Sequence, residues 1–273
     1  MHCRCMLFPI LIQFLDPPFA GSVLPVPECR TSSMVQRSAP TSGFVRASFT
    51  ECSFAQWLRA VPLLPEGSPV LLYNGTLKYR QDIHAAVLDV SVGKKDLQQC
   101  ADAVMRLRAE FLFANGQADA ITFHFTNGFK ADWRRWRAGE RINVVRNSCT
   151  WTKSGSPNSS HDELLRYLDK VFTYAGTLSL ERELKACGNR PVQAGDVFIH
   201  GGSPGHAMLV VDVAVHPDGR QAFLLAQSYM PAQQIHVVKN LRKPALGAWF
   251  VLNEGDRLYT PEWTFAWDER KRW

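Results

Sequence analysis

The stretch Ala194–Val215, with the sequence AGDVFIHGGSPGHAMLVVDVAV, decides the fold of this chain. A Gly-Asp turn leads into a short apolar strand, a loop of Gly, Ser and Pro follows, and His206 opens a second, longer apolar strand. An imidazole at the edge of a strand, beside a loop of small residues, can reach a substrate while its own strand stays rigid. We therefore expect the functional site to centre on His206.

The last third of the chain predicts further strands around this stretch. Short β-branched and aromatic runs, separated by Gly and Pro turns, cover residues 195–200, 206–215, 221–229, 235–239 and 247–252. Helical patterns come earlier, at about 54–61, 94–115, 131–139, 162–174 and from 179 onward. Helices first and strands last predict an α+β fold, with the helices packed on one side of a curved antiparallel sheet.

Length and composition exclude several classes of protein. The chain has 273 residues, of which 46% are hydrophobic and 21% charged, so it is neither disordered nor collagen-like. The net charge of +6 fits an anionic surface or substrate without requiring one. The chain has seven cysteines and no CxxC pair, and the five that follow residue 20 are widely spaced, so we expect at most one or two disulfides.

The amino-terminal region predicts targeting rather than a membrane span. The longest apolar run, Met6–Leu15, contains Pro9 and is far shorter than the ~20 residues that a spanning helix needs. It follows Arg4 and precedes small residues, which predicts a weak secretory signal peptide over residues 1–20. Residues 21–44 are rich in Ser, Thr and Pro and read as a linker, which leaves 45–273 as a single α+β domain.

The Gly-Asp turn at 195–196, the following Phe198 and the apolar strand after His206 resemble the barrel half of papain-like hydrolases. The similarity is to the NlpC/P60 and CHAP types, which are cell-wall amidases and peptidases. In those enzymes the His is the general base, and a polar residue on the next strand orients its ring. The resemblance implies that His206 is the base and that Gln227 or Ser228 is the orienting residue.

The resemblance also implies a nucleophile at the start of the helix that precedes the Gly-Asp turn, where this chain has Thr177 and Ser179. A thiol is a few per cent ionised at neutral pH, whereas an unassisted hydroxyl is essentially not, so this departure argues against acyl transfer. Cys52 is a rival nucleophile, because Glu-Cys-Ser before a helix resembles the DCS motif of the same hydrolases. The competing interpretation is a strand-end His206, a capping Ser179 and an ordinary thiol.

Segments spread over most of the chain resemble a second, more specific family. They include LYNG at 72–75, HAAVLD at 84–89, DLQQCADAV at 96–104, FTNGF at 125–129, YAGTLSL at 174–180, GDVFI at 195–199, PGHA at 204–207 and LAQSYMP at 225–231. Together they resemble the bacterial domain of unknown function 4846 family over about residues 41–273. This resemblance implies an exported protein whose activity is unassigned.

Polar side chains in these segments are candidates for substrate binding. Lys78, Gln81 and His84 precede or open a predicted strand, and Asn127 lies in a predicted turn. A pocket shared by His84, Asn127, His206 and Gln227 would suit a polar ligand, and ordinary capping and turn chemistry is the alternative. The His-x5-His spacing of 200 and 206 lacks the geometry of a metal site, so we expect no metal and no cofactor.

Basic residues gather between Lys130 and Arg146 and are interleaved with Trp133 and Trp136. Aromatic rings among cations can stack on sugars and bind nearby anions. A solvated helix face with both Trp side chains in the core is the alternative interpretation. No nucleic-acid-binding motif is present, so the partner we expect is a cell-wall or other polar polymer.

Three functional hypotheses follow from the sequence. The first is an exported, periplasmic protein that binds, with or without hydrolysis, a peptidoglycan-like amide or ester, with His206, Gln227 and Thr177 or Ser179 in the site. The second is a non-catalytic cell-wall or glycan-binding module that uses Trp133, Trp136 and the basic cluster. The third is a structural partner in an envelope complex. A cytoplasmic location and the oligomeric state stay open.

Overall fold

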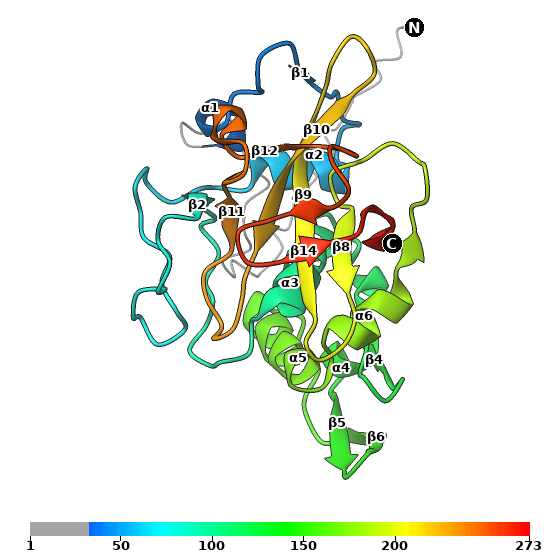
Figure 1. Ribbon diagram of the computed structural model, residues 1–273. Coiled ribbons are helices and arrows are strands. Elements are labelled where there is room, and N and C mark those ends of the chain that lie inside the picture. The colour runs from blue at the N-terminus through cyan, green and yellow to red at the C-terminus, as the bar shows by residue number, and fades with distance from the viewer. Residues whose placement is uncertain (1–32) are drawn as a thin grey trace, which may run out of the picture.

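The computed structural model describes residues 33–273 (Figure 1). The predicted signal peptide 1–20 and most of the predicted linker lie outside this part of the chain. Among the described residues no helix is both long and apolar enough to cross a bilayer. The cysteines at 52, 100, 149 and 187 are all free thiols.

Nine strands of the described chain form one antiparallel sheet. Its main path runs β2 (His84–Val87), β11 (His236–Val238), β10 (Gln221–Gln227), β9 (His206–Val215), β8 (Val197–His200), β15 (Arg270–Arg272) and β7 (Lys185–Ala186). In addition, β1 (Val45–Arg46) pairs with β9, and β12 (Trp249–Val251) pairs with β10. The five strands that the sequence predicts in the last third are confirmed, as is their antiparallel pairing.

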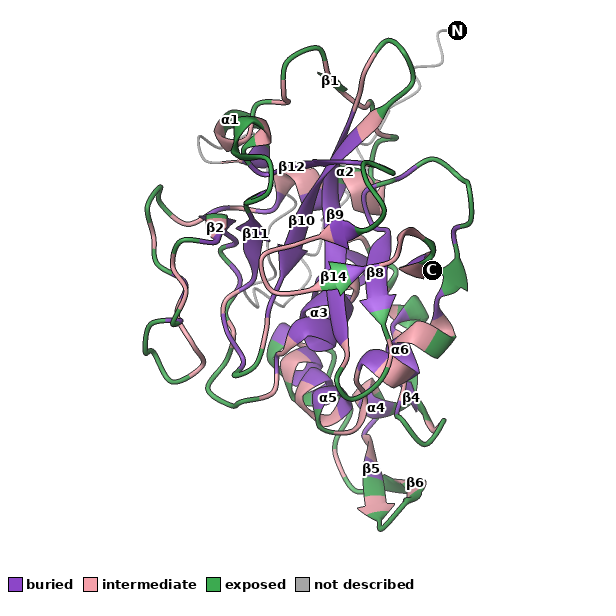
Figure 2. Ribbon diagram, in the orientation of Figure 1, coloured by how far each residue is buried: buried purple, intermediate pink, exposed green. Residues whose placement is uncertain are grey.

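Both faces of the sheet are covered, as the buried centre of Figure 2 shows. Side chains of β9 alternate between the faces, because successive residues of a strand point in opposite directions. Ala207 and Leu209 belong to the apolar cluster that includes the helix α3 (Cys100–Ala114). Met208 and Val210 belong to a second cluster, which includes Phe265 from the C-terminal end of the chain.

The second face is covered by a hairpin of β13 (Leu258–Tyr259) and β14 (Thr264–Phe265), followed by the 3-10 turn η3 (Trp267–Glu269). In Figure 1 this hairpin lies in front of β8 and β9, and α3 lies behind them. The fold is thus a mixed α/β structure with a large antiparallel sheet and few helices.

The remaining elements surround this centre. The helices are α1 (Met34–Arg37), α2 (Phe54–Ala60), α4 (Trp133–Arg137), α5 (His161–Tyr174) and α6 (Thr177–Glu183), with 3-10 turns η1 (Ala118–Ala120) and η2 (Pro244–Leu246). Two hairpins complete the list, β3 (Thr122–His124) with β4 (Lys130–Asp132), and β5 (Glu140–Val145) with β6 (Ser148–Lys153). The β5–β6 hairpin, which the sequence analysis did not identify, projects from the end of the molecule in Figure 1.

The helix predicted over 94–115 begins later than expected, at Cys100. Asp96 supplies the physical reason, because its carboxylate accepts hydrogen bonds from the Ala232 amide and the Gln99 side chain. These bonds hold the segment before the helix in an irregular conformation. The helix ends as predicted beside Gly116, whose φ of +69° suits a left-handed residue after a helix. Cys100 is therefore the first residue of α3 and not part of its middle.

Part of the predicted linker is packed into the fold. Met34 is fully buried in the helix-side cluster. Arg46 donates hydrogen bonds to the carbonyls of Met34 and Ser38, and the indole of Trp249 donates to the carbonyl of Ala39. The folded region therefore starts before residue 45, where the sequence analysis placed its boundary.

A buried ion pair fastens the beginning of the described chain to β9. The Asp212 carboxylate is fully buried and accepts from Arg46 Nε at 2.9 Å and from Arg59 Nε at 2.7 Å. Two guanidinium groups on one carboxylate satisfy an acid that would otherwise be costly to bury.

We predict that Asp212→Ala lowers the free energy of unfolding by about 3 kcal/mol or more, because it leaves two partly buried guanidinium groups without a counter-charge. Asp218→Ala is the matched control, since its ion pair with Arg220 lies at an exposed turn. Urea unfolding followed by circular dichroism measures both variants. Equal effects of the two changes would contradict the role given to Asp212.

Candidate functional site

The His206 imidazole opens β9 and is 1% exposed. Its Nε2 lies 2.8 Å from Oε1 of Gln227, at the end of β10. Aromatic rings enclose it, with centroid distances of 5.0 Å to Tyr229, 5.5 Å to Trp263 and 6.0 Å to Phe265. Its Nδ1 is buried and has no hydrogen-bond partner. The structure thus places the His206 ring in hydrogen-bond contact with Gln227 and leaves its Nδ1 without a partner.

The hydrogen bonds of Gln227 fix which ring nitrogen of His206 carries the proton. The Gln227 amide nitrogen lies 2.6 Å from a carboxylate oxygen of Glu262 and 3.3 Å from Nε2 of His236. His236 Nδ1 faces the carbonyl of Gln234, so it donates there and its Nε2 accepts. Both amide hydrogens of Gln227 are therefore committed, and its oxygen must accept from His206 Nε2–H. This leaves a lone pair on His206 Nδ1.

Burial determines the charge of both histidines. Loss of solvent lowers the pKa of His206 to about 4, and the Gln227 hydrogen bond offsets part of that effect. Burial likewise lowers the pKa of His236 to about 3. Both rings are therefore neutral at pH 7. A neutral imidazole with a free Nδ1 lone pair is the form that can act as a general base.

Cys100 begins α3, which packs on the face of β9 that carries the Ala207 side chain. The backbone of Ala207, the residue that follows His206, acts on the Cys100 thiol and lowers its pKa. The preceding segment is tied to the end of β10, because Ser228 Oγ donates to the carbonyl of Gln98 at 2.8 Å. The first residue of α3 is thereby held between the start of β9 and the chain that leaves β10.

The Cys100 thiol is protonated in this arrangement. Burial raises its pKa to about 11, although the Ala207 amide and the backbone amides at the start of α3 act in the opposite direction. The same amides lack partners within the helix and point toward its N-terminus, where developing negative charge is stabilised. The site therefore combines a thiol, a neutral base and helix amides, all shielded from water.

The sequence analysis did not identify Cys100 as a site residue. The helix predicted over 94–115 includes Cys100 in its interior, and a buried helical Cys is usually structural. The sequence feature that could have identified Cys100 is the start of a helix at Gln98-Gln99-Cys100, ahead of the strand that opens with His206. That signal depends on where the helix begins, and the contacts of Asp96 decide this.

The predicted hydroxyl nucleophiles have other roles. Ser179 Oγ exchanges hydrogen bonds with the backbone of Gly176 and so caps α6. Thr177 Oγ1 bonds to the backbone of Gly202. Within residues 33–273, Gln227 is the only side chain within hydrogen-bond distance of the His206 ring. Cys52 is exposed, ahead of α2. The structure therefore pairs none of these three with the imidazole.

The predicted binding residues divide into two groups. Lys78 belongs to the group of polar residues around Gln227. Its Nζ lies 2.6 Å from Oε1 of Glu262, whose Oε2 contacts the Gln227 amide. His84 packs edge-on against His236, with 6.2 Å between ring centroids. Gln81 supports the Lys78 backbone, since its amide bonds to the carbonyl of Lys78.

Asn127 does not belong to the group of polar residues around Gln227. It lies in the turn between β3 and β4, where its amide bonds to Asn147 and Cys149. The predicted pocket of His84, Asn127, His206 and Gln227 is therefore wrong for Asn127. A turn residue's position relative to a distant strand is set by packing, which its local pattern does not report.

Trp133 and Trp136 are core residues and not a stacking surface. Trp133 is fully buried, and Trp136 is 7% exposed and donates to Glu163. Both rings pack on Tyr167. Much of the basic cluster is also neutralised, since Arg134, Arg135, Arg137 and Arg141 pair with Asp132, Glu140, Asp119 and Glu163 in that order.

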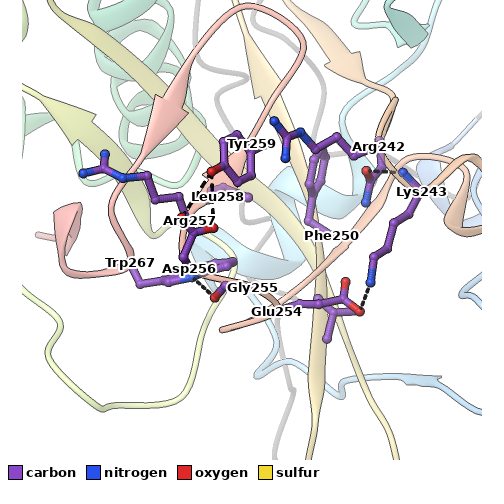
Figure 3. Close-up of a pocket in the computed structure, with 12 residues that line it drawn as sticks. Arg242, Lys243, Phe250, Glu254, Gly255, Asp256, Arg257, Leu258, Tyr259 and Trp267 are labelled. Carbon is purple, nitrogen blue, oxygen red and sulfur yellow. Dashed lines mark hydrogen bonds and ion pairs between the residues drawn. The ribbon is translucent and has the colours of Figure 1, made fainter.

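A surface cavity of about 190 Å³ lies beside β12 and β13 (Figure 3). It is lined by side chains such as Arg242, Phe250 and Tyr259, and by neither His nor Cys. Because its lining offers neither an imidazole nor a thiol, we place the candidate site at His206 and Cys100 instead.

The burial of Cys100 has a measurable consequence. We predict that at pH 8 iodoacetamide alkylates exposed Cys52 at least about tenfold faster than Cys100, because a raised pKa and exclusion of water both reduce attack by the Cys100 sulfur. Peptide mass spectrometry over a time course gives the two rates. In 6 M urea the two rates should converge. Comparable rates in the folded protein would show that the site is open.

The comparison with known proteins identifies a family. The model of the family described as domain of unknown function (4846) matches residues 34–272. The chain belongs to this family, as its segments suggested. No curated protein and no solved structure gives a significant match.

Proposed function

We propose that this member of the domain of unknown function 4846 family is a thiol hydrolase that cleaves an amide or ester bond. Cys100 is the nucleophile, His206 the general base and Gln227 the positioning residue. The observation that carries the proposal is the buried, unpartnered Nδ1 of His206, on the strand whose next residue, Ala207, acts through its backbone on the Cys100 thiol at the start of α3.

The proposed reaction uses each of these groups. His206 Nδ1 takes the thiol proton as the Cys100 sulfur attacks the substrate carbonyl, which forms a tetrahedral oxyanion near the first amides of α3. The intermediate expels an amine or alcohol, which leaves with the proton from His206. Water then attacks the thioester, gives a proton to His206, and releases the acid and the regenerated thiol. Gln227 keeps Nε2–H engaged, so that Nδ1 is the nitrogen that accepts.

The order of elements supports a papain-like, NlpC/P60-type arrangement as the finer fold. A helix with a Cys at its first residue precedes the strand that opens with His206, and the next strand supplies the amide of Gln227. The region from β3 to α6 lies between helix and strand as an insertion. On this basis we retain the substrate class expected from the sequence, a peptidoglycan-like amide or ester, and an exported location.

Substitutions test the nucleophile and the base directly. We predict that Cys100→Ala and His206→Ala each reduce turnover of a muropeptide and aryl-ester panel by at least about 10²-fold, because each removes a group that reacts in every cycle. Cys187→Ala is the matched control for loss of a buried thiol, and Ser179→Ala tests the hydroxyl predicted from sequence. Both controls should retain turnover. Loss of turnover in Ser179→Ala alone would contradict the assignment of Cys100.

The pH profile tests the environment of the base. Because burial lowers the pKa of His206 to about 4, the base stays unprotonated down to that pH. We predict that kcat/KM, which reports the free enzyme, keeps its value through pH 6 and falls near pH 4. An acid limb near 6.5, the ordinary pKa of histidine, would show that the working site is solvated.

A further inference from the structure

The segment from Leu252 to Phe265, here called the C-terminal strap, closes the site. It runs from the end of β12 through β13 to β14 and lies across the sheet face that carries His206. Trp263 packs on His206, and Phe265 packs on both His206 and Phe198. The strap therefore excludes water and substrate from the imidazole.

The strap also inserts a carboxylate into the site. Glu262 Oε1 lies 2.6 Å from Lys78 Nζ, and its Oε2 lies 2.6 Å from Gln227 Nε2. The two donors come from outside the strap and are 6% and 1% exposed. A buried ammonium and a buried amide that converge on one carboxylate form a built site for that group.

Lys78 needs a counter-charge whenever the strap moves. Among the described residues its only ion pair is with Glu262. Its Nζ also lies over the Tyr229 ring, 5.6 Å from the ring centroid. A buried cation that loses its partner is strongly unfavourable. Any state that exposes His206 to substrate must therefore supply another anion, or water, to Lys78.

We infer that the substrate carries a carboxylate that replaces Glu262 between Lys78 and Gln227, and that the strap occupies this subsite until substrate displaces it. The inference rests on the proposed function, which makes the bound molecule a substrate. Because Gln227 contacts both the carboxylate and His206, the carboxylate of the substrate lies close to its scissile bond. A peptide or glycopeptide with a free carboxylate at that position has the required chemistry.

The outer part of the strap offers a matched control. Glu254 pairs with Lys243 at 2.5 Å, and Arg242 stacks on Tyr259, both at the surface (Figure 3). Glu254→Gln removes a carboxylate from the same segment without touching Lys78, Gln227 or His206. Glu262→Gln keeps the size and polarity of the inserted side chain but removes its charge.

The first measurement is modification of His206 by diethyl pyrocarbonate at pH 7, followed by peptide mass spectrometry, which needs no turnover. We expect Glu262→Gln to accelerate this modification about tenfold or more over wild type, because one charge-assisted contact of the strap that covers the imidazole is lost. Glu254→Gln should leave the rate unchanged. A folded Glu262→Gln variant with the wild-type rate would overturn the role of the strap.

The second measurement tests the carboxylate subsite. Sodium N-acetylglycinate, at constant ionic strength, should raise the Tm of Glu262→Gln and slow modification of its His206, whereas neutral N-acetylglycinamide should do neither. The double variant Glu262→Gln, Lys78→Met should lose both effects. Equal effects of the acid and the amide would overturn the carboxylate assignment. Because neither measurement depends on hydrolysis, an inactive but carboxylate-binding protein would refute only the proposed function.

Discussion

Burial of β9 on both faces is the constraint on which the rest of this structure depends. Its ten residues run through the centre of the sheet, and all but the last are buried. A strand of this kind needs one layer on each side, and the chain supplies α3 for one face and the C-terminal strap for the other. The ion pairs of Asp212 then fix the early part of the chain against the same strand.

The candidate site follows from this two-sided burial. His206 is the first residue of β9; its imidazole faces the C-terminal strap, and the side chain of the next residue, Ala207, faces the α3 layer. The α3 layer brings the Cys100 sulfur to the backbone beside it, and the strap brings Trp263 and Glu262. The same burial keeps the thiol protonated and the imidazole neutral, so the arrangement is a closed form of the proposed enzyme.

Local patterns predicted those parts of the site that lie on regular elements. The strand that opens with His206 and the neighbouring strand that ends with Gln227 could be read from alternating apolar runs, and antiparallel pairing brings their ends together. Lys78 could be suspected because it is a polar residue shortly before a predicted strand. Cys100 could not be assigned in the same way, because its role depends on a helix start fixed by contacts between Asp96 and the distant Ala232.

The sequence by itself determined the antiparallel sheet, the position of His206 at a strand edge, and the family to which the chain belongs. Each of these depends on periodicity or on short motifs, which are properties of neighbouring residues. The tertiary structure alone decided that α3 begins at Cys100 near the backbone of Ala207, that Trp133 and Trp136 are core residues, and that Glu262 fills the space between Lys78 and Gln227. Those relations join segments far apart in the chain, and packing and the pairing of buried charges determine them.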